Sequence, residues 1–323
     1  MVRAIRFSAF GGPEVLEYRD VELDAPLPGE ARVAHRAIGV NFIDVYHRTG
    51  LYPLTLPSGL GGEAAGVVTA VGAGVTQVRK GDRVAYTAPA PLGSYADERN
   101  VDARWLVRLP AAIDDQTGAA MMLKGLTAWY LLKRSYKVEE GDFVLLYAAA
   151  GGVGLIAAQW ARELGARVIG IVGSEAKREL ALARGCEHVL LDGEDIPKRV
   201  REIAGGGVPV VYDSVGRTSF YQSLDCLRTH GVLVSFGNSS GKVEPFSLIE
   251  LMRRGSLHVT RPTLLDFIRE RSDLEAGCTE LFDLVERGRV KIEVRQTHAL
   301  HNAAQAHRDL EARRTTGCTV LIP

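Results

Sequence analysis

The chain has 323 residues, in which 39 Lys and Arg residues balance 39 Asp and Glu residues. This length is enough for a large apolar core and favours two domains over one. The balanced charge excludes a general electrostatic attraction to nucleic acid or to an anionic membrane surface.

The sequence carries no targeting or membrane signal. It contains no apolar run long enough to span a bilayer, and the opening MVRAIRFSAFGGPEV lacks the charged-then-apolar pattern of a signal peptide. The four cysteines (Cys186, Cys226, Cys278 and Cys318) lie at least 40 residues apart and form no CxxC pair. Such spacing is typical of reduced thiols. We therefore expect a cytoplasmic protein without membrane insertion.

Short segments broken by Gly and Pro fill residues 1–123, as in EARVAHRAIGVNF and GVVTAVGAGV. This texture predicts an irregular, mostly antiparallel β domain. Residues 124–262 differ, because apolar runs alternate there with stretches of helical length. The runs are Phe143–Tyr147, Arg167–Val172, His188–Leu191, Val208–Tyr212 and Gly231–Phe236. Since parallel strands require long crossovers, this alternation predicts an α/β fold with a doubly wound parallel sheet.

Residues 263–323 return to a mixed pattern. Helices are predicted around EAGCTELFDLVERG and AAQAHRDLEARRTTG, followed by a short final strand in CTVLIP. We expect this segment to pack back on the first domain.

A glycine-rich turn, AAAGGVG at residues 148–154, follows the apolar run FVLLY and precedes the helical run VGLIAAQWA. In the dinucleotide-binding pattern GxGxxG, the glycines permit a tight turn, approach of pyrophosphate and close helix packing. Ala149, Gly151 and Gly154 occupy these places. Because helix N-terminal amides favour phosphate, the context predicts a nucleotide site, with a ligand-free turn as the alternative.

The segment IVGSEAKR indicates which nucleotide is bound. NAD sites usually end the second strand with a carboxylate, whereas NADP sites supply a cation for the 2′-phosphate. Here Gly173 and Ser174 are followed by Lys177 and Arg178. This favours NADPH and predicts Lys177 on the turn beside the adenosine ribose. The alternative for both cations is a solvated helix face.

The segments GGEAAGVV, GDRV and AAAGGVG together resemble the medium-chain dehydrogenase/reductase superfamily. Its zinc alcohol dehydrogenases carry Cys where Asn41 stands and His where Gly62 stands, ahead of the shared Glu63. Neither ligand nor a cluster of structural cysteines is present, so the resemblance implies no zinc site. We expect His35, His47 and His258 to be ordinary core or surface residues.

Further motifs narrow the resemblance. AIGVNFIDVYHRTGLYP, LKGLTAWYLL, YAAAGGVGLIAAQWA, VVYDSVG, VSFGNSSG, VTRPTL and LIP occur in order over nearly the whole chain. They are similar to the zinc-free NADPH:quinone oxidoreductases, a group that includes the zeta-crystallins. The resemblance implies a GroES-like catalytic domain (1–123), a Rossmann NADPH-binding domain (124–262), a return to the catalytic domain (263–323) and a homodimer.

The same resemblance implies the site residues. Those expected to contact NADPH are Asn41, Phe42, Asp44, Tyr46, Tyr130, Gly151, Gly152, Val153, Gly173, Ser174, Lys177, Gly237, Asn238, Ser239, Ser240, Thr263 and Arg313. The expected substrate pocket contains Asn41, Tyr46 and Tyr52, although both tyrosines also suit an ordinary aromatic wall, and Asn238 also suits a simple turn. The family's tyrosine beside the adenine is missing near Asp192.

The sequence offers no Ser-His-Asp triad and no CxxC pair, which leaves nucleophilic hydrolysis without its parts. A quinone accepts electrons readily, so a dry site that holds it against the nicotinamide is sufficient. We therefore predict NADPH-dependent reduction of a small-molecule quinone, with no side chain required as acid or base. Two alternatives stay open. One is reduction of activated C=C bonds in enals or enones, with Tyr46 or Tyr52 as proton donor; the other is a non-catalytic NADPH-binding role, crystallin-like or RNA-binding.

Overall fold

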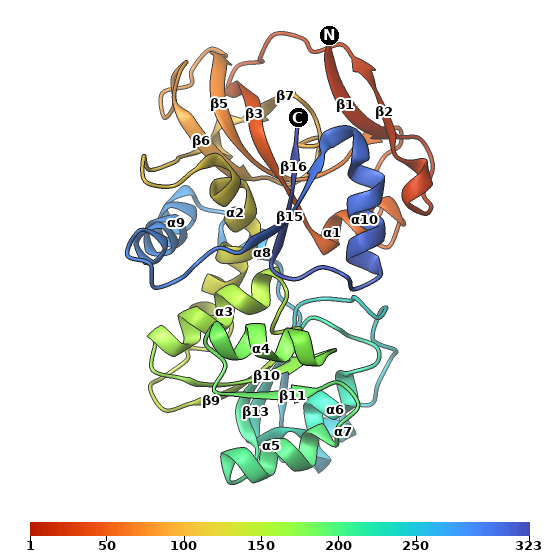
Figure 1. The fold of residues 1–323 in the computed structure, drawn as a ribbon, viewed down its shortest axis with the longest axis vertical. Helices are drawn as coiled ribbons and strands as arrows, with labels where there is room; N and C mark the ends of the chain where they lie inside the picture. The colour runs from red at the N-terminus through yellow and green to blue at the C-terminus, as the bar shows by residue number, and fades with distance from the viewer. The chain divides into compact units, whose positions relative to one another are not determined.

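The computed structural model describes residues 1–323, which form two units (Figure 1). Unit 1 comprises Met1–Leu126, Ile268–Glu286 and Ile292–Pro323, and unit 2 comprises Thr127–Phe267 and Arg287–Lys291. The domain limits predicted from the sequence, after residues 123 and 262, stay a prediction. Helix α2 (Asp115–Tyr130) runs across the first of these limits without a break.

Unit 2 is built on a six-stranded parallel sheet of order β11-β10-β9-β12-β13-β14. Its strands are β9 (Phe143–Tyr147), β10 (Arg167–Val172), β11 (His188–Leu191), β12 (Val208–Asp213), β13 (Leu227–Ser235) and β14 (His258–Thr260). The predicted doubly wound fold is confirmed. The first three strands have the predicted bounds, whereas β12 runs one residue further and β13 begins at Leu227 instead of Gly231.

Helices lie between these strands and follow the last of them. They are α3 (Gly152–Glu163), α4 (Glu175–Ala183), α5 (Ile196–Ala204), α6 (Phe220–Asp225), α7 (Ile249–Arg253) and α8 (Leu264–Phe267), with one π-helical turn at Leu131–Ser135. Figure 1 shows α4 in front of β10. Because helices cover the sheet, its strands are apolar on both faces. Leu145, Ile169, Val211 and Leu233 form the centre of the core and are inaccessible to solvent.

Unit 1 contains a seven-stranded sheet whose main path is β15-β16-β3-β5-β6-β8, with β7 also paired to β3. The strands are β3 (Glu30–Val40), β5 (Glu63–Val71), β6 (Arg83–Thr87), β7 (Glu98–Asp102), β8 (Val107–Arg108), β15 (Val294–Ala299) and β16 (Cys318–Ile322). All pairs are antiparallel except β15 with β16. A smaller sheet joins β2 (Glu17–Val21), β1 (Val2–Phe7) and β4 (Ser58–Gly59).

The C-terminal segment completes the larger sheet of unit 1. Strand β16 pairs with the end of β3, where Thr319 faces Val40. Two longer helices of this unit, α9 (Arg271–Glu286) and α10 (Ala303–Glu311), come from the same segment, while α1 (Phe42–Arg48) follows β3 directly. Three 3-10 turns, at Pro13–Val15, Ala103–Trp105 and Leu300–Asn302, complete the unit. No helix of either unit combines the length and apolar character needed to cross a membrane.

Candidate functional site

The glycine turn of unit 2 joins β9 to α3. Its left-handed residue is Ala148, with φ of 52°, and Gly151 closes the turn by donating its N–H to the Ala148 carbonyl at 2.8 Å. Ala149 is buried and has room because Gly170 on β10 has no side chain: a Cβ at residue 170 would lie 2.7 Å from that of Ala149. Alanine is therefore compatible with the first position of the pattern.

The last glycine of the pattern is required by packing. A Cβ on Gly154 would lie 2.3 Å from the Ala148 carbonyl oxygen, a separation that real Cβ atoms do not show. Gly151 is the N-cap of α3 and no side chain caps the helix, so the N–H groups of the first turn keep their donor capacity. Gly152 and Val153 are half-buried at this end. The turn thus fits a phosphate group.

The segment after β10 provides the second part of this face. Gly173 has no heavy atom within 4 Å of the place a Cβ would take, and Ser174 is the N-cap of α4. Lys177 lies in the first turn of α4, so its predicted place on a turn is wrong, whereas its place beside the adenosine ribose stays a prediction. The error arises because α4 begins directly after Ser174. Arg178 forms ion pairs with Glu194 at 3.1 Å and with Glu175 at 3.5 Å.

Residues 237–240 follow β13 and are attached to the loop after β12. Ser239 and Ser240 donate their N–H groups to the carbonyls of Ser214 and Val215, at 3.3 and 2.9 Å. Asp213, which sequence reasoning missed, holds the β12 loop: its buried carboxylate accepts bonds from two backbone amides and two serine hydroxyls. The carboxyl ends of β9, β10 and β13 therefore bring three predicted segments to one edge of the sheet.

The other predicted residues of unit 2 have structural surroundings of their own. Tyr130 ends α2 and is buried, with its ring stacked on that of Phe267 at 4.7 Å. Thr263 directly precedes α8. Asp192, in the region where the family has a tyrosine, follows β11 and donates its N–H to the Val172 carbonyl.

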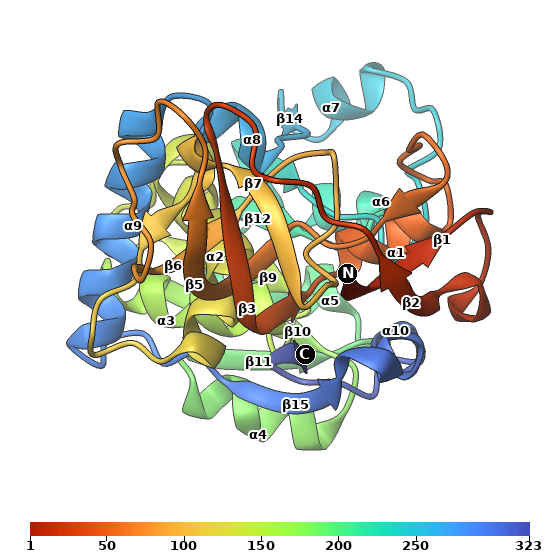
Figure 2. The ribbon, with the colours of Figure 1, turned by 90° about the horizontal axis from the view of Figure 1, so that it is seen from above.

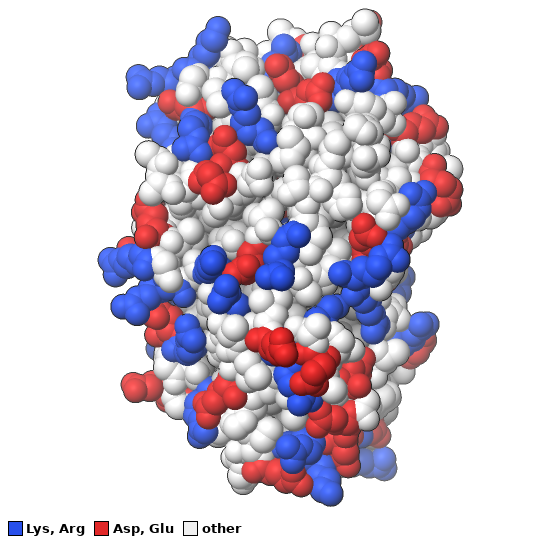
Figure 3. Space-filling view, in the orientation of Figure 1, with Lys and Arg blue, Asp and Glu red and all other residues white.

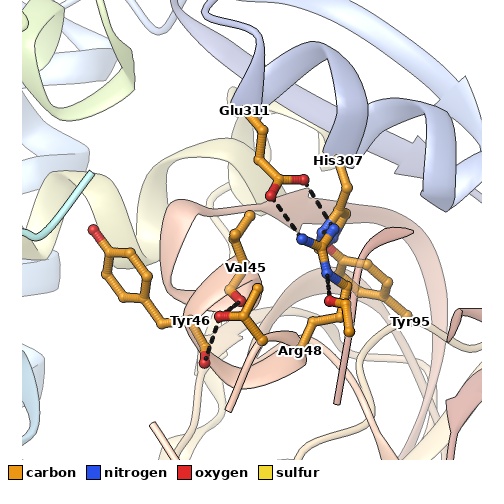
Figure 4. A network of polar contacts seen from close by, with 8 residues as sticks. Val45, Tyr46, Arg48, Tyr95, His307 and Glu311 are labelled. Atoms are coloured by element: carbon orange, nitrogen blue, oxygen red, sulfur yellow. Dashed lines mark hydrogen bonds and ion pairs between the residues drawn. The ribbon is translucent and has the colours of Figure 1, made fainter. Parts of the chain in front are cut away.

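In unit 1 the predicted residues cluster at the start of α1. Asn41 is the N-cap, and Asp44 accepts its N–H at 2.9 Å. The ring of Tyr46 lies 5.5 Å from that of Phe42 and 5.2 Å from that of Tyr52, measured between centroids. These three rings form one aromatic group, and its first member, Phe42, directly follows Asn41 in the sequence. Figure 4 shows Tyr46 directed away from the polar residues on the other side of α1.

Those polar residues form a chain of hydrogen bonds that is buried except at Glu311 (Figure 4). Arg48 makes a bidentate ion pair with Glu311 at 2.7 and 2.9 Å and contacts His307 Nδ1 at 3.2 Å. The Nε2 atom of His307 lies 3.2 Å from the Tyr95 hydroxyl, which donates to Asp44 Oδ2 at 2.9 Å. The chain ties α10 to α1, and sequence reasoning found only its last member.

The protonation states of His307 and Asp44 decide which group donates and which accepts in each hydrogen bond of this chain. Burial lowers the pKa of His307 to about 3, helped by the Arg48 charge, so the imidazole is neutral near pH 7. Its Nδ1 accepts from Arg48, and its Nε2 donates to Tyr95. Burial also raises the pKa of Asp44 to about 7, against the opposing effect of its hydrogen bonds from Asn41 and Tyr95. Asp44 is thus an acid that changes charge near neutrality.

The residues at the zinc-ligand positions of the related alcohol dehydrogenases have other neighbours here. Asn41 donates through Nδ2 to Glu63 Oε2 at 2.7 Å, and the ammonium of Lys124 lies 3.2 Å from the same oxygen. A Cβ on Gly62 would lie 2.7 Å from the Ala88 carbonyl oxygen. No group of three or more His, Cys, Asp or Glu side chains is placed to hold a metal ion.

Arg313, the last predicted residue, lies just beyond α10, is exposed and has a left-handed backbone with φ of 56°. Sequence reasoning missed Tyr95, Lys124 and His307. A signal existed for Lys124, because it is the single charge in the stretch 116–132, where an apolar helix would bury it.

Comparison with known proteins agrees with this geometry. Residues 27–111 match the alcohol dehydrogenase GroES-like domain, and residues 152–282 match the zinc-binding dehydrogenase family. The chain is 52% identical to a quinone oxidoreductase of Pseudomonas aeruginosa and 45% identical to a 2-haloacrylate reductase of a Burkholderia species, with at least 99% of each chain covered. The crystal structure of Escherichia coli quinone oxidoreductase complexed with NADPH superposes with a TM-score of 0.97 at 48% identity, covering 99% of this chain and 100% of that one. The chain therefore belongs to the quinone oxidoreductase family of the medium-chain dehydrogenase/reductase superfamily.

Proposed function

We propose that this protein catalyses NADPH-dependent reduction of quinones to hydroquinones. The observation that carries the proposal is the sheet edge of unit 2. There the N-terminus of α3, which no side chain caps, follows β9, and Lys177 in the first turn of α4 follows β10. No carboxylate stands at Gly173 or Ser174 to repel a 2′-phosphate. The relatives support the choice, since one of them was crystallised with NADPH.

The residues proposed to hold NADPH divide by the part of the cofactor that they suit. The first turn of α3, with Gly151, Gly152 and Val153, suits the pyrophosphate. Gly173, Ser174, Lys177 and Arg313 suit the 2′-phosphate, because cations and hydroxyls favour that group. The remaining proposed contacts are Asn41, Phe42, Asp44, Tyr46, Tyr130, Gly237, Asn238, Ser239, Ser240 and Thr263.

Asn41, Tyr46 and Tyr52 are the residues we assign to the quinone. Aromatic rings stack against a flat quinone ring and exclude water. NADPH, when bound, would supply a hydride, which is equivalent to two electrons and one proton. Water would supply the second proton that the hydroquinone needs. The side chains then hold the ring in place, and none of them needs to act as an acid or base.

Steady-state turnover tests this function. We expect NADPH oxidation with a panel of ortho- and para-quinones, at a rate well above that with NADH. Tight NADPH binding without oxidation by any quinone would refute the proposal. Including 2-haloacrylate and simple enones in the panel separates the proposal from the second candidate.

That second candidate is reduction of activated C=C bonds, favoured by the 45% identity to the 2-haloacrylate reductase. A carbon acceptor requires a proton on the neighbouring carbon, and the hydroxyls of Tyr46 and Tyr52 are the proposed donors. Phe at either position should then reduce enone turnover at least tenfold while sparing quinones. The relatives compared here are named as enzymes, which favours catalysis over a crystallin-like or RNA-binding role.

The proposed partner is a small molecule instead of a nucleic acid. Figure 3 shows both Lys and Arg and Asp and Glu on the face viewed, and the 39 basic residues of the chain are balanced by 39 acidic ones. We also propose a cytoplasmic location, which is consistent with four free, buried cysteines.

We propose that the protein forms a homodimer through unit 2. Strand β14 is the last strand of its sheet, so one side of its backbone has no neighbouring strand (Figure 2). The same unit exposes Leu248 and Met252, at 75% and 62% of their surface. A dimer mass by light scattering, converted to a monomer by Leu248→Glu with Met252→Glu, is the expected result. A monomeric wild-type protein would refute it.

A further inference from the structure

A buried charged cluster in unit 1 surrounds the side chain of Asn41. Glu63 begins β5 and is inaccessible to solvent, and Lys124, on α2, is 6% exposed. The Glu63 carboxylate accepts three bonds: from Leu123 N at 2.7 Å, from Asn41 Nδ2 at 2.7 Å and from Lys124 Nζ at 3.2 Å. Burial of charges is costly unless they are paired, and here the carboxylate and the ammonium pair with each other.

The lysine remains a cation in this position. Burial alone lowers the pKa of Lys124, but the charge of the Glu63 carboxylate and its hydrogen bond outweigh that effect, so the pKa lies above its ordinary value. Lys124 and Glu63 therefore compensate each other as a pair. A compensated carboxylate has no hydrogen to donate and acts only as an acceptor.

This acceptor decides which way the Asn41 amide faces. An asparagine presents an N–H donor at one end and a carbonyl at the other, and a flip exchanges them. Flipping Asn41 would place its carbonyl oxygen against Glu63 Oε2, so that two acceptors would face each other. The nitrogen is thus held toward Glu63 with one of its two hydrogens, and its second N–H is left as a donor in a fixed direction.

The backbone of β3 leaves space for the Glu63 carboxylate that orients the Asn41 amide. A Cβ on Gly39 would lie 2.1 Å from Glu63 Oε2 and 2.4 Å from the Ala119 carbonyl oxygen. Any side chain at residue 39 would displace the carboxylate from Asn41. Gly39 therefore belongs to the same cluster.

We propose that Glu63 and Lys124 are positioning residues that orient the Asn41 amide, so that its second N–H donates to a carbonyl oxygen of the bound reactants. This rests on the proposed function, in which Asn41 borders the reactants. Two carbonyls have the required chemistry: that of the quinone and that of the nicotinamide carboxamide. Asn41 would touch the reactants, and Glu63 and Lys124 would act through it.

A double-mutant cycle tests this chain of action. In the full-length protein, Glu63→Gln and Lys124→Met should each lower kcat/KM for a quinone about 10- to 100-fold, and Asn41→Ala should lower it similarly. Glu63→Gln added to Asn41→Ala should change kcat/KM less than about twofold. Equal losses from Glu63→Gln with and without Asn41 would overturn the proposal. Lys124→Arg, which keeps the charge, should retain most activity, and Glu187→Gln, in an exposed ion pair, serves as control.

Measured constants decide which of the two carbonyl groups accepts the hydrogen bond from Asn41. Quinone kcat/KM falls in either case; a rise in the NADPH dissociation constant beside that fall assigns the nicotinamide carboxamide, and an unchanged NADPH dissociation constant assigns the quinone. Both results support the proposal. Unchanged values for all of these constants in Asn41→Ala would overturn it.

A spectroscopic measurement keeps the inference independent of turnover. In the protein without cofactor, the Asn41 side-chain N–H signals, assigned by their loss in Asn41→Ala, should include one hydrogen shifted downfield by the carboxylate. The shift should disappear in Glu63→Gln and persist in Lys124→Arg. If this holds while no quinone is reduced, the proposed function fails and the orientation of Asn41 stands. Its absence in the wild-type protein would overturn the orientation itself.

Discussion

The Tyr95 hydroxyl donates a 2.9 Å hydrogen bond to Asp44 Oδ2, and both groups are buried. Because Asp44 also accepts the N–H of Asn41, this bond links the β domain interior to the first turn of the helix that carries Tyr46. Replacing Tyr95 by Phe leaves the ring in place and removes the bond. We expect Tyr95→Phe to lower the free energy of unfolding by about 1–3 kcal/mol, because a buried acceptor and the His307 donor lose their partner.

Urea unfolding at neutral pH measures this loss. Tyr221→Phe is a suitable control, since Tyr221 is half exposed and its hydroxyl makes no buried hydrogen bond. Equal stabilities of the two variants would show that the Tyr95 hydroxyl contributes nothing.

Asp44 should give stability an unusual pH dependence. Its pKa is about 7 in the folded protein and 3.8 as the ordinary value, so the folded state binds the proton more tightly. Its contribution is therefore complete below about pH 4 and is lost as pH rises through about 7, a difference of at most roughly 4 kcal/mol. Asp44→Asn should remove this dependence.

The measurement compares the unfolding free energies of wild type and Asp44→Asn at about pH 4.5, 6 and 8. His307 acts in the opposite direction in both proteins, since its pKa of about 3 makes acid destabilising below pH 6.5, and it therefore cancels. A difference that does not move with pH would contradict the prediction.

Lys177 should distinguish NADPH from NADH. Removing its charge loses a charge-assisted interaction with the 2′-phosphate, so Lys177→Ala should raise the NADPH dissociation constant about 10- to 100-fold. The NADH constant should change less than about twofold. Fluorescence titration of both nucleotides provides the values. Arg178→Ala, which removes the neighbouring cation of α4, is the matched control. Equal weakening of both nucleotides by Lys177→Ala would exclude phosphate recognition.

The glycine turn should tolerate a methyl group at one place and reject it at another. Gly154→Ala places a Cβ 2.3 Å from the Ala148 carbonyl oxygen, and the shift of α3 should cost about 1–3 kcal/mol of stability and weaken NADPH binding. Gly173→Ala enters open space and should leave the free energy of unfolding unchanged. Thermal and urea unfolding of the two variants gives the comparison. A stable Gly154→Ala protein with normal NADPH affinity would contradict this account of the turn.

Five of the six strands of unit 2 were predictable, because a parallel sheet covered by helices requires apolar runs that are separated by crossovers. A local run of apolar residues is enough to predict such a strand, as in β9 with residues FVLLY. Strand β14, with three residues, was not predicted. Partners that are distant in sequence leave no such trace. His307 meets Tyr95 across 212 residues and Glu63 meets Lys124 across 61, and nothing in their local context specifies these pairs.

Helix starts formed an intermediate case. The sequence placed Ser174 and Lys177 in one segment, but the backbone turns into α4 directly after the serine, so the lysine is helical. The residue types that bind a phosphate could be identified from the sequence, whereas the backbone conformation at these residues could not.

The pairing of β16 with β3 has a consequence for biosynthesis. Residues 127–267 of unit 2 are continuous, so this part can begin to fold as soon as it leaves the ribosome. Strand β3 pairs early with β5 and β7, but its last residues, which lead into Asn41, wait on one side for β16, which is translated after unit 2. A nascent chain should therefore acquire a folded nucleotide unit first and complete the sheet beside Asn41 last, with the exposed edge of β3 a target for chaperones in the interval.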